Sequence, residues 1–198
     1  PLASISGSVQ LLMEADHVNQ EDRRLMGIVV KEAERLSGLL TDFLTFARPK
    51  APEKRNVDIC TVIAELLEIL GNDPRFQHVA IEAECPDKKI IAIDHGQVWQ
   101  VLWDLAVNAV EAMNGKGVMR IGVVPESGEV FVEDNGPGVS DDIVDQIFDP
   151  FFSLKEKGTG LGLASVYSIM EAHGGRVKVA RSELGGARFC LDFSRKGE

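Results

Sequence analysis

Three glycines at alternate positions, Gly158, Gly160 and Gly162, stand directly before an apolar run with helical spacing in "KEKGTGLGLASVYSIM", residues 155–170. Glycine allows backbone N–H groups to approach an anion closely, and the start of a following helix adds the positive end of its dipole. The pattern therefore indicates a phosphate cradle. A flexible surface loop is the more common explanation of an isolated glycine cluster, so the rest of the chain has to decide.

This loop does not match the two commonest nucleotide signatures. A P-loop needs G-x-x-x-x-G-K-[ST], and no Lys-Ser or Lys-Thr follows these glycines. A Rossmann fingerprint needs G-x-G-x-x-G after a strand, but the third glycine comes one residue early and the preceding "FDPFFSLKEK" is not typical of a strand. A phosphate site here would belong to another fold.

A second candidate is a polar stripe on a helix predicted near 94–113, which is otherwise apolar nearly all round. The stripe consists of carboxamides and carboxylates: Gln97, Gln100, Asp104, Asn108 and Glu111. A solvated helix face would be expected to carry Lys or Arg as well, and this stripe has neither. Amide and carboxylate oxygens are the ligands that a hard cation such as Mg²⁺ selects. The stripe therefore favours a Mg²⁺ site over a solvated face.

A third candidate is "FVEDNGPGV", residues 131–139, in which a β-rich run ends at Asp134 and the glycines Gly136 and Gly138 follow. Taken alone, this segment is typical of a hairpin turn. The combination is more specific, because the Asn-bearing helix, D-x-G-x-G, "IFDPFFS" and G-x-G-x-G follow one another in this order.

The elements that position these residues fall into two regions. Residues 1–48 have helical periods around the polar turn "EADHVNQED", which predicts an α-helical hairpin. Its apolar stripes are too wide for one hairpin to bury, so we expect two copies to dimerise into a four-helix bundle; the alternative is that the hairpin lies on the second domain. Residues 49–57 contain prolines and basic residues and predict a linker.

The second region, residues 58–198, mixes helical and strand periods. Helices are predicted near 58–71, 94–113 and 160–173, and strands near 78–83, 89–93, 118–124, 129–134, 176–182 and 187–193. Hairpin-linked strands with helices long enough to cover one face predict an α+β fold, a two-layer α/β sandwich.

The composition is that of a globular protein, with 44% hydrophobic and 26% charged residues among 198. A net charge of −10 argues against a nucleic-acid or anionic-membrane surface. The 3 cysteines form no C-x-x-C pair, which favours a reducing, cytoplasmic setting without disulfides or zinc. No apolar run of about 18 residues is present, so no membrane contact is expected. A first residue of Pro1 suggests a piece of a longer chain.

From about residue 58 to 193, the four motifs resemble the ATP-binding catalytic domain of sensor histidine kinases, which share the Bergerat (GHKL) fold with gyrase, Hsp90 and MutL. The first region resembles the dimerisation and histidine-phosphotransfer hairpin of nitrogen-regulatory and pilus-type sensors. "PLASISGSVQLL" is similar to the continuation of their H-E-[IL]-R-N-P-L box, and "LLTDFLTFARP" is similar to their second helix. The resemblance implies the domains 1–48, 49–57 and 58–198 already delimited.

The resemblance also implies a role for each motif in binding ATP and Mg²⁺. Asn108 corresponds to the residue whose side-chain oxygen binds Mg²⁺ beside the triphosphate, and Asp134 to the carboxylate that accepts a hydrogen bond from the adenine amino group. Gly136 and Gly138 let the loop pass close to the base. The phenylalanine box that hinges the ATP lid and the glycine box that holds the phosphates are matched by Phe148, Phe151, Phe152, Gly158, Thr159, Gly160, Leu161 and Gly162.

Three positions depart from the family pattern. Asp104 stands where a second asparagine is usual, and both a hydrolytic role, as for the Glu of gyrase-like ATPases, and a role toward Mg²⁺-bound water stay open. Glu111 stands where many members have Lys, which shifts phosphate neutralisation to Lys155 and Lys157. Ala187 stands where the last strand commonly offers Thr or Ser to the adenine.

By the same resemblance, the phospho-accepting His would lie upstream of Pro1. The chain's own histidines are placed in a turn (His17), at a strand start (His78), at a helix start (His95) and at a helix end (His173), and none has an acceptor's context. The chain is therefore expected to bind ATP without phosphorylating itself.

The function that the resemblance implies is transfer of the ATP γ-phosphoryl group to a His on the helical hairpin and then to an Asp of a response regulator receiver domain. The alternatives are an ATP-hydrolysing clamp of the gyrase or Hsp90 type and a non-catalytic nucleotide-binding dimerisation module. The hairpin and the short lid argue against the clamp, and the intact Asn108 and Asp134 argue against the module. The expected partners are ATP, a second copy of the chain and the receiver domain. Membrane anchoring of the full-length protein stays open.

Overall fold

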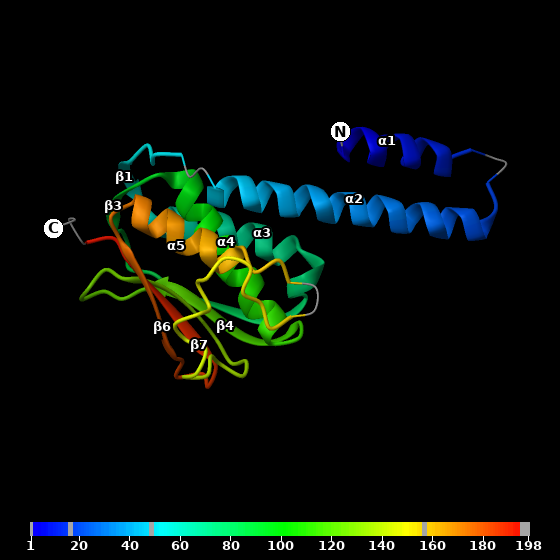
Figure 1. The fold of residues 1–198 in the computed structure, drawn as a ribbon. Coiled ribbons are helices and arrows are strands. Elements are labelled where there is room, and N and C mark those ends of the chain that lie inside the picture. Colours follow the sequence, from blue (N-terminus) through cyan, green and yellow to red (C-terminus); the bar gives the residue numbers. More distant parts are fainter. Residues whose placement is uncertain (1, 16–17, 48–49, 156–157, 195–198) are drawn as a thin grey trace. The chain divides into compact units, whose positions relative to one another are not determined.

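The computed structural model describes residues 2–15, 18–47, 50–155 and 158–194, and the chain divides into two compact units, Pro1–Arg48 and Pro49–Glu198 (Figure 1). The first unit is the predicted helical hairpin. Helix α1 (Leu2–Met13) packs along helix α2 (Gln20–Ala47), which the chain enters after reversing direction. Asn19 caps α2, because its Oδ1 accepts a hydrogen bond from the backbone N–H of Asp22 at 2.8 Å.

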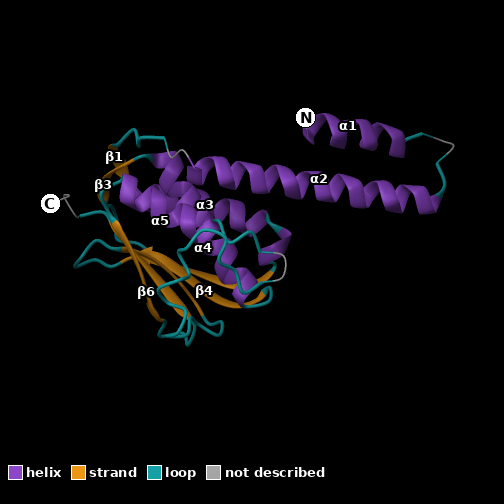
Figure 2. Ribbon diagram, in the orientation of Figure 1, coloured by secondary structure: helices purple, strands orange, loops and turns teal. Residues whose placement is uncertain are grey.

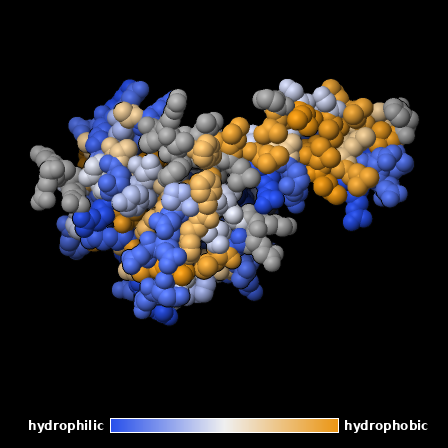
Figure 3. Space-filling model, in the orientation of Figure 1, coloured by the Kyte–Doolittle hydropathy of each residue, from blue (hydrophilic) through white to orange (hydrophobic). Residues whose placement is uncertain are grey.

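The hairpin leaves large apolar side chains exposed, as its wide stripes predicted. These exposed side chains lie on both helices: Ile5, Leu11, Leu12, Leu25, Ile28, Val29, Leu36, Leu40 and Phe43. Figure 3 shows hydrophobic residues gathered over the hairpin. Among the residues that the structure describes, none of the helices combines the length and apolarity that crossing a membrane requires.

The second unit is the predicted α+β sandwich, with helices on one face of a mixed sheet (Figure 2). The sheet has the strand order β2-β4-β5-β7-β6, in which β2 and β4 are parallel and the other pairs antiparallel. Its strands are β2 (His78–Glu84), β4 (Lys116–Val123), β5 (Val130–Asp134), β6 (Arg176–Arg181) and β7 (Ala187–Asp192). The covering helices are α3 (Ile59–Asn72), α4 (His95–Ala112) and α5 (Gly162–Ala172), and a short 3₁₀ turn, η1 (Pro74–Phe76), follows α3.

Strand β1 (Arg55–Asp58) was not predicted and lies at the end of the predicted linker. It pairs antiparallel with β3 (Ile90–Ile93) in a separate two-stranded sheet, with Val57 opposite Ile91. Asp58 then caps α3, accepting a hydrogen bond from the backbone N–H of Cys60 at 3.2 Å. The chain therefore passes from the linker into the second unit through a paired strand.

The core lies between the helices and the sheet. Helix α4 contributes the apolar face that the sequence predicted, including Val98, Val101, Leu102 and Leu105, which are fully buried. Because side chains alternate along a strand, Val130, Val132 and Asp134 of β5 share the face that packs against this core. The last of these positions brings a carboxylate to the edge of the core beside α4.

The opposite face of β5 carries a buried ion-pair cluster next to Asp134. Glu133 is fully buried and lies 2.9 Å from Arg120 of β4 and 3.1 Å from Arg188 of β7. The hydroxyl of Ser182 donates a further hydrogen bond to its carboxylate at 2.9 Å. A buried carboxylate with these partners is compensated for its lost hydration, and the cluster joins the three central strands at the level of Asp134.

Candidate nucleotide site

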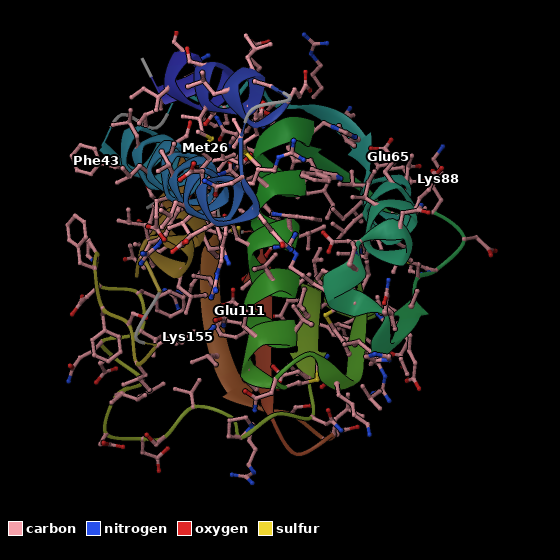
Figure 4. The ribbon with its side chains drawn as sticks, turned by 90° about the vertical axis from the view of Figure 1, so that its right-hand side faces the viewer. Met26, Phe43, Glu65, Lys88, Glu111 and Lys155 are labelled. Carbon is pink, nitrogen blue, oxygen red and sulfur yellow. The ribbon has the colours of Figure 1, made fainter. Side chains whose placement is uncertain are left out.

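The polar stripe of α4 meets the loop that carries Lys155, just before the glycine turn of residues 158–162. Asp104 and Asn108 are half-buried on α4, whereas Glu111 is exposed. The ammonium of Lys155 donates to Asn108 Oδ1 at 3.1 Å and contacts Glu111 Oε2 at 2.6 Å. Figure 4 shows Glu111 on its helix with Lys155 on the neighbouring loop. Lys155, which was predicted to neutralise the phosphates, therefore contacts two residues of the stripe that was predicted to bind Mg²⁺.

Asp134 is buried at the carboxyl end of β5, with 3% of its surface exposed. Its Oδ1 accepts hydrogen bonds from the backbone N–H of Gly136 at 2.8 Å and of Ala187 at 3.4 Å. Burial raises the pKa of this carboxyl group above its ordinary value, and the two N–H donors oppose that shift. Because these two N–H groups bind Oδ1, Oδ2 is the oxygen suited to a hydrogen bond from a ligand.

Glycines keep the surroundings of Asp134 open. A Cβ added to Gly136 would lie 2.9 Å from Asp134 Oδ1, so this position needs a residue without a side chain. Gly138 has φ +79°, and its added Cβ would lie 3.2 Å from the carbonyl oxygen of Gly186. A Cβ on Gly186 would overlap Asp134 itself. Gly186 was not predicted as a site residue, although the adjacent glycines before Ala187 indicate a close backbone approach.

The phosphate-holding glycine box, residues 158–162, forms a turn that leads into α5. Gly160 has φ +66°, and a side chain there would overlap the backbone of Phe151, whose N–H donates to the Gly160 carbonyl at 3.0 Å. The hydroxyl of Thr159 accepts from the backbone N–H of Leu161 at 3.1 Å. Nothing lies within 4 Å of a Cβ added to Gly162, which begins the helix, and no side chain within the described residues caps α5 there. Backbone donors at this end are suited to an anion.

The phenylalanine box anchors the base of this turn. The ring of Phe148 packs against Tyr167 at 5.9 Å and meets Phe189 edge-on at 6.5 Å, and Phe152 is half-buried against the core. Phe151 differs from both, because it is 64% exposed and holds φ at 68°, a strained value for a side-chain-bearing residue.

A cavity of about 440 Å³ opens where α4, η1 and the lid loop, the segment between Phe152 and α5, meet. Its lining residues are Arg75, Val110, Glu111, Asn114, Gly115, Lys155 and Gly158. Arg75 was not predicted as a site residue. It pairs with Asp73 at 2.6 Å and lies over the Trp103 ring at 5.1 Å. Hydrogen bonding to Asp73 raises the pKa of Arg75, against the effect of burial, and the charge of Glu111 raises it further. Only the tertiary fold brings this arginine to Glu111.

Some predicted residues are not at the site or cannot be placed there. Lys157 and His17 lie outside the described residues. His78 begins β2, and His95 at the start of α4 lies 2.9 Å from Glu65. His173 ends α5, as predicted, and is buried.

The sheet covered on one face by three helices, with a glycine turn leading into α5, is the architecture of a Bergerat-type nucleotide-binding domain. Comparison with known proteins supports this fold assignment. Residues 93–197 match the family of histidine kinase-, DNA gyrase B- and HSP90-like ATPases, and residues 1–52 match the His Kinase A (phospho-acceptor) domain.

Individual relatives extend over both units. The sensor histidine kinase ZraS of Escherichia coli K12 is 34% identical over 195 residues, and sporulation kinase D of Bacillus subtilis is 30% identical over 185 residues. These matches cover 96% and 90% of this chain but only 42% and 36% of the two relatives. The crystal structure of full-length ShkA in complex with AMPPNP superposes with a TM-score of 0.80 at 29% identity, covering 96% of this chain and 42% of that chain. The chain belongs to the sensor histidine kinase family of GHKL ATPases.

Proposed function

We propose that the chain forms the ATP-binding and hairpin units of a protein-histidine kinase of a two-component system. The proposal rests on the buried Asp134, whose surroundings are kept open by glycines. The same domain carries the Asn108–Glu111–Lys155 contact beside the glycine turn. The first group suits a purine base and the second a metal-bound triphosphate. The names of ZraS and sporulation kinase D and the AMPPNP bound to ShkA support the same activity.

In this proposal, Asp134 selects adenine. Its Oδ1 is occupied by the N–H groups of Gly136 and Ala187, and we assign Oδ2 to the amino group of the base. Gly136 and Gly138 give the base room. With Ala187 in place of a hydroxyl-bearing residue, the last strand contributes its backbone N–H to Asp134 rather than a side chain to the nucleotide.

The phosphates would lie against the glycine box of residues 158–162. The start of α5 has no side-chain cap among the described residues, so its first backbone N–H groups would bind the phosphates, and the Lys155 ammonium beside Asn108 would pair with them. The assigned phosphate-binding residues are Gly158, Thr159, Gly160, Leu161, Gly162, Lys155 and Lys157. Asp104, half-buried one helical turn before Asn108, is assigned to water in this region.

Mg²⁺ fits the residues present at Asn108. The amide oxygen of Asn108 accepts a hydrogen bond from a cation, the Lys155 ammonium, which supports its assignment to a place for positive charge. Asn108 would hold the metal, which neutralises phosphate charge when it is bound. Within the described residues, no group of three or more His, Cys, Asp and Glu forms a separate metal site.

The hairpin is assigned to dimerisation and to presenting a phospho-accepting His. Its exposed apolar side chains support pairing with a second copy in a four-helix bundle. The γ-phosphoryl group would pass in line to that His and then to an Asp of a response regulator receiver domain. Because the reaction needs ATP, we expect the catalytic unit to work in the cytoplasm.

Transfer between two chains tests this function. The chain is mixed with a longer hairpin that carries a His in the family's acceptor sequence and is incubated with γ-labelled ATP. We expect acid-labile, base-stable label on the longer partner, because the nucleotide and the His need only be brought into line. Steady ATP hydrolysis without such label would support the clamp instead, and unlabelled partner despite ATP binding would contradict the kinase assignment.

A further inference from the structure

The contact between Lys155, Asn108 and Glu111 places a cation on two oxygens of one helix. The Lys155 ammonium lies 3.1 Å from the amide oxygen of Asn108 and 2.6 Å from a carboxylate oxygen of Glu111. Residues three apart on a helix lie on the same face, so both oxygens are directed to one place. An amide oxygen beside a carboxylate oxygen is the donor set that a hard divalent cation selects.

We propose that Glu111 is the second protein ligand of the nucleotide-associated Mg²⁺, and that Lys155 is a tethered cation that holds its place until Mg²⁺-ATP arrives. The inference rests on the proposed function and assigns to Glu111 a metal-binding role. On exchange, the ammonium leaves the two oxygens and pairs with the phosphates. Two cations do not share these oxygens at equilibrium, because their mutual repulsion is strong at such short separation.

The structure makes this exchange easy. The side chains of Lys155 and Glu111 are 40% and 50% exposed, so solvent screens their ion pair and little stability is lost when it opens. The backbone of Lys155 is held separately, because its N–H donates to Ser153 Oγ at 3.1 Å and its carbonyl accepts from the Gly158 N–H at 3.1 Å. Rotation about the bonds of the long side chain therefore moves the ammonium while the loop stays in place.

The charge of Glu111 also requires a cation. A carboxylate beside a triphosphate would repel it unless positive charge lies between them. In the nucleotide-free chain Lys155 supplies that charge, and in the loaded chain Mg²⁺ does. Glu111 thereby makes ATP binding depend on the metal more strongly than Asn108 alone would.

The test measures metal dependence of binding rather than activity. Calorimetry gives the Kd for ATP in EDTA and in excess Mg²⁺, and the ratio of the two is the metal preference. For Glu111→Gln we expect this preference to fall by at least about tenfold, because a metal-site oxygen has lost its charge. For Lys155→Gln we expect weaker binding of metal-free ATP and a larger metal preference, because the competing ammonium is gone.

Glu126→Gln is the matched control. Glu126 lies in the turn between β4 and β5, whose register places Val123 opposite Val130 at the turn and Met119 opposite Asp134 at the far end. The Glu126→Gln substitution removes the same charge at a distance from the site, and this variant should keep the original metal preference.

Two results would overturn the inference while leaving the proposed function intact: an unchanged preference in Glu111→Gln, or unchanged metal-free binding in Lys155→Gln. An unmodified chain that binds no ATP under either condition would remove both. Because Glu111 is exposed, the variant should fold, and Glu111→Asp, which keeps the charge, should retain more of the preference than Glu111→Gln.

Discussion

At the scale of single residues, Asp134 shows a conflict between stability and binding. The side chain is 3% exposed, and burial raises its pKa, so the native state binds a proton here more tightly than the unfolded chain does. Stability from this group is therefore lost as the pH rises from its ordinary pKa of about 3.9 through the raised value. At neutral pH the buried, ionised carboxylate lowers the stability of the nucleotide-free domain. A hydrogen bond donated by a ligand would offset this loss.

Asp134→Asn should separate these two effects. The amide keeps an acceptor for the N–H groups of Gly136 and Ala187 and carries no charge, so the thermal midpoint of the nucleotide-free protein should stay the same or rise. ATP binding should weaken by roughly 1.5–3 kcal/mol, because a charged acceptor is replaced by a group that presents a donor to the adenine amino group. Differential scanning calorimetry and ATP titration give both values. A destabilised variant with normal ATP affinity would refute this account of Asp134.

At the scale of elements, the lid turn depends on one left-handed glycine. Gly160→Ala should cost about 1–2 kcal/mol of stability from the φ of +66° and should also weaken ATP binding, because the new Cβ meets the Phe151 backbone. Gly128→Ala is the control, since Gly128 has φ +75° in the β4–β5 turn and its Cβ would meet only the end of the Lys89 side chain. Urea unfolding should show the larger stability loss for Gly160→Ala, because its Cβ overlaps backbone atoms rather than a movable side chain, and ATP titration should show a binding loss for Gly160→Ala alone. Equal ATP affinities in the two variants would contradict the lid assignment.

The junction of α5 with α4 predicts a pH dependence. His173 is buried with Nδ1 2.8 Å from the Ile169 carbonyl and Nε2 accepting the Asp94 N–H at 3.1 Å, which is the pattern of a neutral ring. Burial lowers the pKa of His173, so the unfolded chain takes up the proton first as the pH falls. Stability present at neutral pH should be lost as the pH falls from about 6.5 toward the lowered pKa.

Denaturant unfolding of the native chain and of His173→Gln between about pH 7.5 and pH 5, a range that spans the ordinary histidine pKa, checks this point. The variant should be less stable at neutral pH, and its stability should fall less on acidification. Parallel pH profiles for the two proteins would show that His173 does not control stability in this range.

The same scale shows how much of the structure the sequence predicts. Apolar periodicity sufficed for α4, because burial of Val98, Val101 and Leu102 depends on spacing along one helix. Strand β1 was missed because its pairing with β3 joins segments distant in sequence, and its composition is that of a linker. Arg75 was missed because its place beside Glu111 exists only after folding, whereas the paired glycines before Ala187 were a signal from which Gly186 could have been predicted.

At the scale of the whole molecule, the exposed apolar faces of α1 and α2 predict a dimer. Light scattering should give twice the mass of one chain. Leu36→Asp should produce a monomer that still binds ATP, because Leu36 is 51% exposed on α2 and belongs to the unit Pro1–Arg48. Glu34→Ala, about half a turn away on the same helix, should remain dimeric. A monomeric unmodified chain would exclude the four-helix bundle.

The measurement that tests the central claim most directly is calorimetric titration of the unmodified chain with ATP and with GTP in the presence of Mg²⁺. The account places adenine's amino group on Asp134, where guanine would present a carbonyl acceptor to an acceptor. ATP should bind at least about tenfold more tightly than GTP, since a lost charged hydrogen bond is worth roughly 1.5–3 kcal/mol. Equal affinities for the two nucleotides, or no binding of ATP, would contradict the account.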